Sequence, residues 1–323
     1  MRFLKIIIKK IIVIPVIWRT IGALIRREGI VVLMYHRVTP DKGPFSALPL
    51  EKFRQQMLWL KKNCNILHPD EFIKQIDNAS RARPSVLITF DDGQRCVHDV
   101  IYPVLKELEI PATVFLATNS MDNGGLIWTD EVSWTISETK LVSFCLPWDP
   151  DTELNLETDT ARSYAARVCK KYLKALPDAE RKQWQALLLK TLEAGEPSLQ
   201  LEREMLNWDE VRACRDVFVF GGHTHNHPIM SKLDHESLEN EVLTCRDRMM
   251  QELGTAPTTF AYPNGESCDF NQDCKDVLTK YGFTTAFTTI EGINTTTTDV
   301  LELKRVPTGA EAVEDLAWMM MRA

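Results

Sequence analysis

Short runs of β-branched and aromatic residues recur along this chain, and most are followed by a segment with helical spacing. We predict buried strands at residues 30–35, 85–90, 112–117, 217–220, 258–262, 284–288 and 300–306. We predict helices at residues 97–108, 236–253 and 272–281, and others beginning at Pro69 and near Trp208, the last with a capping box of Asn207 and Glu210. Strands that alternate with helices are typical of an α/β fold with a parallel sheet.

Residues 120–205 do not follow this pattern. The middle of the region, 162–194, is helical in spacing and highly charged. We therefore predict a helical insertion at about 120–205 within a domain that spans 29–323. Trp128, Trp134 and Trp148 in this region are candidates either to stack on sugar rings or to pack in the core.

The composition is that of an ordinary globular protein. Of the 323 residues, 44% are hydrophobic and 26% are charged, which excludes collagenous, mainly disordered and polytopic membrane proteins. The net charge of −7 argues against a nucleic-acid partner. The eight cysteines form no C-x-x-C pair, so we expect reduced thiols and a cytoplasmic protein.

The N-terminal segment, residues 1–28, is basic and apolar. Its basic residues are Arg2, Lys5, Lys9, Lys10, Arg19, Arg26 and Arg27, and its longest uncharged run, 11–18, is too short to span a bilayer. We expect an amphipathic helix in the headgroup plane of the inner membrane face, with Trp18 near the interface. The alternative is an amphipathic helix that packs on the protein's own core.

Three predicted strands end in polar clusters. Asp91-Asp92-Gly93 follows the strand at 85–90, the histidine-rich segment 223–228 follows 217–220, and the segment 262–265 ends the strand at 258–262. Ligands bind at the carboxyl ends of strands in parallel α/β proteins. The three clusters therefore predict one site.

The residue types in these clusters indicate a metal. One aspartate and two histidines are typical of a catalytic zinc site, which keeps one position open for water. Spacing does not distinguish His223, His225 and His227, and the alternative is three solvated loop histidines. If one aspartate of the pair binds the metal, the other is free to act as a base; the alternative is an ordinary Asp-Asp-Gly turn.

Together, TFDDG at 89–93, HTHNHP at 223–228 and FAYPNG at 260–265 resemble the metal-dependent polysaccharide deacetylase family, which is the NodB-homology group or carbohydrate esterase family four. The resemblance covers about residues 30–118 and 206–307. It implies a distorted (β/α) barrel of about seven parallel strands, and an enzyme that removes an acyl group, usually acetyl, from an amino sugar.

The resemblance also implies the metal site and the base. Asp92, His223 and His227 resemble the metal ligands, whereas His225 does not. The ion implied is divalent, Zn²⁺ in the first place, with Co²⁺ or Ni²⁺ as alternatives. Asp91 resembles the catalytic base.

Two loops have implied roles as well. Thr224 stands where the family has a Ser or Thr that steadies the histidine loop. The loop with Tyr262, Asn264 and Gly265 resembles the wall that gives a backbone N–H to the oxyanion, from Asn264 or else from Tyr262.

The sequence departs from the family pattern at two points. The arginine that normally opens the third motif and orients the base is missing, and we expect Arg305 to replace it by reaching Asp91; the alternative is a surface ion pair. The family's late Leu-x-x-His is also missing. Leu33-Met34-Tyr35-His36 has that pattern at the front of the domain, as in a circularly permuted member, which would make His36 the general acid. The alternative is a core histidine that caps the strand.

We thus predict a metal-dependent deacetylase of an N-acylated amino sugar in a polysaccharide or lipid-linked saccharide, associated with a membrane surface. One alternative is a hydrolase of another non-peptide C–N bond, such as a deformylase. The other is a sugar-binding homologue without turnover.

Overall fold

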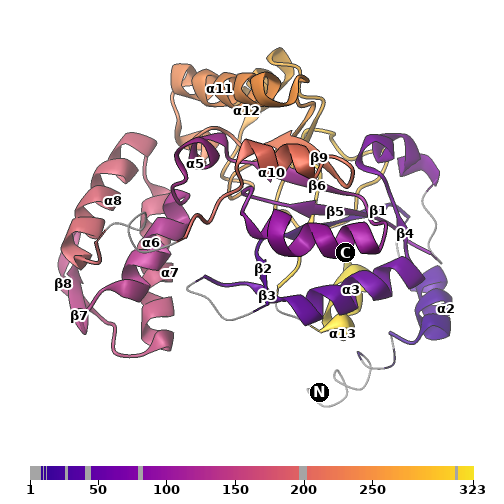
Figure 1. The fold of residues 1–323 in the computed structure, drawn as a ribbon, viewed down its shortest axis with the longest axis horizontal. Helices are drawn as coiled ribbons and strands as arrows, with labels where there is room; N and C mark the ends of the chain where they lie inside the picture. Colours follow the sequence, from indigo (N-terminus) through magenta and orange to yellow (C-terminus); the bar gives the residue numbers. More distant parts are fainter. Residues whose placement is uncertain are drawn as a thin grey trace.

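The computed structural model describes residues 9, 11, 13–25, 28–40, 45–78, 83–195, 202–309 and 312–323. Its centre is a parallel sheet in the order β11–β10–β9–β6–β5–β1–β12, with β4 beside β5 (Figure 1). The strands are β1 (Ile30–Tyr35), β4 (Asn65–Ile66), β5 (Ser85–Phe90), β6 (Ala112–Leu116), β9 (Phe218–Gly222), β10 (Thr259–Ala261), β11 (Thr285–Phe287) and β12 (Val306–Pro307). The predicted barrel of about seven parallel strands is confirmed.

β1 and β5 form the longest strand pair of this sheet. Every residue of both strands is buried, and they pair along their full length from Ile30 opposite Ser85 to Tyr35 opposite Phe90. Strands that are buried on both faces have nearly continuous apolar sequences. This is why the sequence predicted both strands with their correct bounds.

Residues 300–307 connect the two ends of the sheet. Ala286 of β11 donates a backbone hydrogen bond to the carbonyl of Val300, and Thr288 donates one to that of Leu303. Further along, Val306 pairs with β1. The predicted strand at 300–306 is therefore wrong in its bounds: the segment bonds first to β11 and then to β1, and only β12 is regular strand.

Helices cover the outside of the barrel. They are α2 (Pro15–Ile25), α3 (Leu50–Asn63), α4 (Tyr102–Glu107), α5 (Thr118–Asn123), α10 (Trp208–Ala213), α11 (His235–Leu253), α12 (Gln272–Lys280) and α13 (Val313–Arg322). The predicted capping box is present, since Asn207 accepts from the Glu210 amide and the Glu210 carboxylate accepts from the Asn207 amide. The short strands β2 (Val38–Thr39) and β3 (Leu48–Pro49) pair with each other beside this layer.

Two predicted helices differ from those observed. The helix expected from Pro69 is a pair of 3₁₀ turns, Pro69–Glu71 and Ile73–Asn78, because the segment is too short to hold an isolated α-helix. The helix expected at 97–108 begins with a π-helical turn, Val97–Ile101, before α4.

Helix α2 packs on α3. The Trp18 ring is fully buried and contacts the Trp59 ring edge-on, with centroids 4.7 Å apart. The expected position of Trp18 near a membrane interface is therefore wrong, because α3 covers this face of the helix. The opposite face of α2 is open, with Val16 73% and Leu24 76% exposed.

Much of the basic N-terminal segment falls outside the described residues, namely Arg2, Lys5, Lys10, Arg26 and Arg27. Within the described ranges, no helix is long and apolar enough to cross a membrane.

Residues 128–192 form a unit to one side of the barrel (Figure 1). Its elements are α6 (Trp128–Glu138), β7 (Ser143–Leu146), β8 (Asp149–Asn155), α7 (Asp159–Ala175) and α8 (Asp178–Leu192). These elements share a hydrophobic core of their own, which includes Val132, Leu156, Cys169 and Leu188. The antiparallel β7–β8 hairpin was not predicted, because the residues of β8 are mostly polar and exposed. We refer to 128–192 as the helical unit.

Candidate active site

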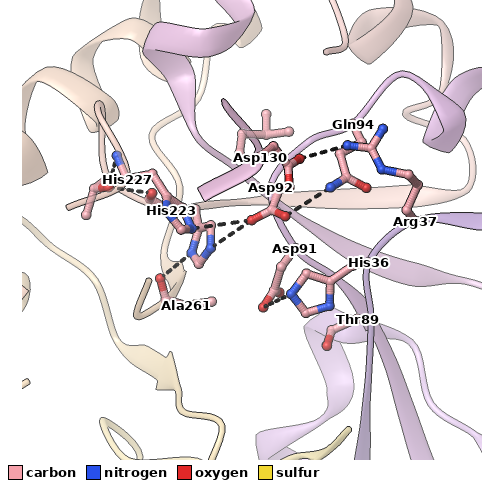
Figure 2. A network of polar contacts seen from close by, with 12 residues as sticks. His36, Arg37, Thr89, Asp91, Asp92, Gln94, Asp130, His223, His227 and Ala261 are labelled. Carbon is pink, nitrogen blue, oxygen red and sulfur yellow. Dashed lines mark hydrogen bonds and ion pairs between the residues drawn. The ribbon is translucent and has the colours of Figure 1, made fainter. Parts of the chain in front are cut away.

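The polar clusters at the strand ends lie in one pocket. It has a volume of about 990 Å³ and lies between the carboxyl ends of the barrel strands and the helical unit. His36 follows β1, Asp91 and Asp92 follow β5, and His223 follows β9. Parallel strands end on the same side of a sheet, so residues far apart in sequence converge here, as Figure 2 shows.

Asp92, His223 and His227 form the centre of the site. Asp92 Oδ1 lies 3.5 Å from His223 Nε2 and 3.4 Å from His227 Nε2, and all three residues are buried. One ligand atom from each lies within 4.8 Å of the other two. This donor set fits the three protein ligands of a catalytic divalent metal.

The protonation of this group suits metal binding. His223 Nδ1 lies 2.7 Å from the Ala261 carbonyl oxygen; a carbonyl only accepts, so Nδ1 carries the proton and the Nε2 lone pair faces Asp92. Burial lowers the pKa of His227, which favours the neutral ring that binds metals.

Gln94 orients the Asp92 carboxylate. Its side-chain Nε2 donates a hydrogen bond of 3.0 Å to Asp92 Oδ2, which leaves Oδ1 facing the histidines. Gln94 was not predicted as a site residue. Its position two residues after Asp92 is the only feature of the sequence that could have indicated this role.

The loops that hold the site are strained. Six non-glycine residues in the described ranges have a positive φ, and four of them are Asp92, Thr224, His227 and Asn264. Non-glycine residues in this conformation are uncommon and cluster at functional sites.

Thr224 stabilises the histidine loop. Its hydroxyl accepts a hydrogen bond of 3.0 Å from the His227 amide and donates to the His223 carbonyl. His225 instead turns toward Thr118, with His225 Nδ1 2.9 Å from the Thr118 hydroxyl oxygen. The structure thus brings His223 and His227, but not His225, to Asp92.

Asp91 forms a buried pair with Arg305. The guanidinium donates two hydrogen bonds, of 2.6 and 2.8 Å, to the two carboxylate oxygens, and the Arg305 side chain is fully buried. Burial alone would raise the pKa of Asp91, but Arg305 outweighs it and the pKa falls. The predicted contact between Arg305 and Asp91 is present, and the alternative of a surface ion pair is wrong.

His36 lies at the mouth of the pocket. Its Nε2 is 4.0 Å from Asp91 Oδ2, and its side chain is 46% exposed (Figure 2). The alternative of a buried core histidine is therefore wrong. His36 lies outside the group formed by Asp92, His223 and His227, as expected for a residue that carries a proton.

The loop at 262–265 contributes one residue to the pocket lining, Asn264. The Tyr262 amide donates to the Phe287 carbonyl at 3.0 Å, and the Gly265 amide donates to the Pro263 carbonyl at 2.8 Å. Tyr262 is therefore wrong as the oxyanion donor, because its N–H is already engaged. Among the described residues, the Asn264 backbone N–H has no hydrogen-bond partner, nor does its buried side-chain amide nitrogen.

The helical unit also reaches the site, which the sequence did not predict. Trp128 donates from its indole nitrogen to the His227 carbonyl at 3.0 Å, and Asp130 accepts from Arg37 at 2.8 Å. Arg37 could have been identified from the sequence because it directly follows His36. Nothing in the sequence around Asp130 indicates that it lies near the site. Trp128 and Trp134 are buried, so they pack in the core rather than offering an open face to a sugar.

The chain is similar to proteins of one family. The sequence profile of the polysaccharide deacetylases matches residues 78–286. A 70-residue stretch is 41% identical to the poly-β-1,6-N-acetyl-D-glucosamine N-deacetylase of Staphylococcus epidermidis, covering 21% of this chain and 24% of that protein. The matched stretch thus spans about a quarter of that relative's length.

Solved structures share the fold over most of the chain. The Streptococcus pyogenes deacetylase PplD, in complex with acetate, is 19% identical and covers 90% of this chain and 98% of its own, with a TM-score of 0.60. IcaB from Ammonifex degensii is also 19% identical and covers 92% of this chain and 98% of its own, with a TM-score of 0.59.

Proposed function

Because the chain belongs to the polysaccharide deacetylase family, we propose that it hydrolyses the N-acyl group, N-acetyl in the first place, of an amino sugar within a saccharide, and that it needs a divalent metal to do so. The most direct support is that three potential metal ligands lie beside a second carboxylate that has a different partner. Asp92 faces two imidazoles, whereas Asp91 faces a guanidinium.

Asp92, His223 and His227 would hold the metal. When bound there, a zinc ion, or Co²⁺ or Ni²⁺ in its place, supplies Lewis acidity that polarises the acyl carbonyl and lowers the pKa of a water molecule. Gln94 and the Ala261 carbonyl keep Asp92 Oδ1 and His223 Nε2 turned to one point, so the ligands are oriented before the ion arrives.

Asp91 is the proposed base. Its lowered pKa keeps the carboxylate ionised at neutral pH, so it can accept a proton from the attacking water. Arg305 holds both Asp91 oxygens in place and takes the part that the arginine of the third motif has in the family.

His36 and Asn264 complete the proposed mechanism. Protonated His36, 4.0 Å from Asp91 at the open side of the pocket, donates a proton to the nitrogen of the sugar as the C–N bond breaks. The unpartnered Asn264 backbone N–H donates to the oxyanion. The products are a free amino sugar and a short carboxylic acid.

We also propose a peripheral position at the cytoplasmic membrane face, and with it a lipid-linked saccharide as substrate. The exposed apolar face of α2 supports this, since Val16 and Leu24 are large apolar side chains with no cover in the described residues. All eight cysteines are free thiols, which suits a reducing compartment.

Release of acetate tests the function. The protein is stripped with dipicolinate, restored with Zn²⁺, Co²⁺ or Ni²⁺, and incubated with β-1,6-linked N-acetylglucosamine oligosaccharides, the polymer named for the Staphylococcus relative. We expect acetate only from the restored protein. Asp91→Asn should keep the metal and lose activity by roughly two to four orders of magnitude.

Metal content provides the matched comparison. His227→Ala should lose the ion, whereas His225→Ala, two residues away, should retain it. The reverse result would show that the ligands are misassigned. Faster release of formate from N-formylglucosamine would favour the deformylase, and sugar binding without any acid release would favour a non-catalytic homologue.

A further inference from the structure

Three cations of one helix line the wall of the pocket opposite the barrel, together with the carboxylates of Asp130 and Asp159. Arg162, Lys170 and Lys174 all belong to α7 and line the pocket, and Ala166 lies between them on the same stripe at intervals of four residues. Residues four apart lie on one face of a helix. In a protein with a net charge of −7, this stripe presents positive charge to whatever enters the pocket.

These cations are not paired with acids. Among the described residues, no carboxylate lies within ion-pair distance of Arg162, Lys170 or Lys174. Lys170 Nζ donates to the Ser133 hydroxyl at 2.9 Å. The acid that acts on Lys170 electrostatically is Asp130, but that carboxylate is bound by Arg37 at 2.8 Å. Lys174 interacts electrostatically with Asp269, which lies beyond ion-pair distance.

Arg162 differs from the two lysines. Its Nη1 donates to the carbonyls of Ile136, Ser137 and Thr139, at the end of α6, and so holds α6 against α7. Lys170 and Lys174 therefore remain as two partly buried ammonium groups one helical turn apart. Burial lowers the pKa of Lys170, and the neighbouring charge of Lys174 adds to this.

Two partly buried like charges destabilise the free protein unless a ligand offsets them. We propose that Lys170 and Lys174 form a subsite for a phosphate or diphosphate ester of the substrate, separate from the point where the acyl group is cleaved. This inference rests on the proposed function and specifies its substrate as an amino sugar that carries a phosphate-type anion.

The chemistry of the wall favours phosphate over carboxylate. Lysines bind phosphate as point charges, whereas planar carboxylates are best matched by the fork of an arginine, and Arg162 is engaged with carbonyls. The Ser163 hydroxyl lines the same wall and can donate to a further phosphate oxygen. The Ser133 hydroxyl already donates to the Thr129 carbonyl at 2.9 Å.

The test compares three N-acetylglucosamine substrates that differ in charge: the neutral methyl glycoside, UDP-N-acetylglucosamine and a polyprenyl diphosphate-linked N-acetylglucosamine in detergent. The variants are Lys170→Gln/Lys174→Gln and, as a control, Lys171→Gln on the exposed side of α7. We expect kcat/KM to favour at least one diphosphate substrate in the native enzyme. The double variant should lower that preference by roughly tenfold or more, and Lys171→Gln should leave it unchanged.

A preference for the polyprenyl diphosphate substrate would identify a lipid carrier as the source of the anion. A preference for UDP-N-acetylglucosamine would identify a soluble nucleotide carrier. Equal kcat/KM for all three substrates, or a preference that survives in the double variant, would overturn the proposal. Acetate release from the neutral glycoside reports on the deacetylase function separately. If no substrate releases acetate, the proposed function fails first; the subsite is then tested by equilibrium binding of UDP-N-acetylglucosamine to the same variants, and equal affinity in all of them overturns it.

Discussion

Two adjacent aspartates have different partners at this site. Asp91 is held by the fully buried Arg305, while Asp92, which has a positive φ, turns toward His223 and His227. The left-handed conformation at Asp92 makes this division possible, because it redirects the chain directly after β5. Two carboxylates with separate environments can take separate roles.

The most direct test at the residue scale concerns His36. His36→Ala should bind metal normally but hydrolyse the amide roughly two to four orders of magnitude more slowly, because the leaving amine needs a proton. An activated ester such as p-nitrophenyl acetate should lose much less, because its leaving group needs little protonation. The ratio of the two rates is the measurement, and equal losses on both substrates would remove His36 from the role of general acid.

The site could be predicted from sequence only in part. Asp91, Asp92 and the histidines stand in compact motifs, and Arg305 could be predicted because the third motif lacked its arginine. Which of Tyr262 and Asn264 has a free amide depends on a backbone hydrogen bond from Tyr262 to Phe287, 25 residues away, which no local pattern shows.

At the scale of elements, buried strands were predicted more accurately from the sequence than exposed ones. β1 and β5 were predicted with their correct bounds because they are apolar on both faces. The β7–β8 hairpin was missed because β8 is largely exposed and polar. The segment 300–307 was misjudged because it bonds to two strands in turn, which a run of strand-forming residues cannot indicate.

Helix α2 has one face packed on α3 and one exposed face, and we expect substitutions on the two faces to have different effects. Trp18→Ala should lower the free energy of unfolding by roughly 3–5 kcal/mol, because it empties a buried site against Trp59. Val16→Ser/Leu24→Ser should leave the unfolding midpoint nearly unchanged and reduce sedimentation with anionic vesicles. Deleting residues 1–27 would mix the two effects, since it also removes Trp18.

Unchanged sedimentation of the Val16→Ser/Leu24→Ser variant would rule out this face as an anchor. Salt separates the electrostatic part of the binding, because attraction between basic residues and anionic lipid weakens as ionic strength rises.

At the scale of the whole molecule, a buried arginine connects the barrel to the helical unit. Arg37 follows the end of β1, and its guanidinium donates to Asp130 of α6 and to Glu204, on the chain that returns from the helical unit. Its side chain also lies over the Phe45 ring, 4.3 Å from the centroid. We therefore expect this one side chain to set part of the separation between the barrel and the α7 wall of the pocket.

Replacing Arg37 should loosen the helical unit before it affects the barrel. Arg37→Met leaves the partly buried Asp130 and Glu204 carboxylates without their cation. Breaking a fully buried pair from one side costs about 3–5 kcal/mol, so we expect a loss of at most this size. We expect amide hydrogen exchange to rise in α6 and α7 while β1 and β5 stay protected, because the helical unit has its own core. Arg37→Met/Asp130→Asn should recover part of the loss, since it removes one stranded charge. Equal acceleration of exchange in the barrel strands and in α7 would show instead that the two parts unfold as one unit and that Arg37 does not set the width of the pocket.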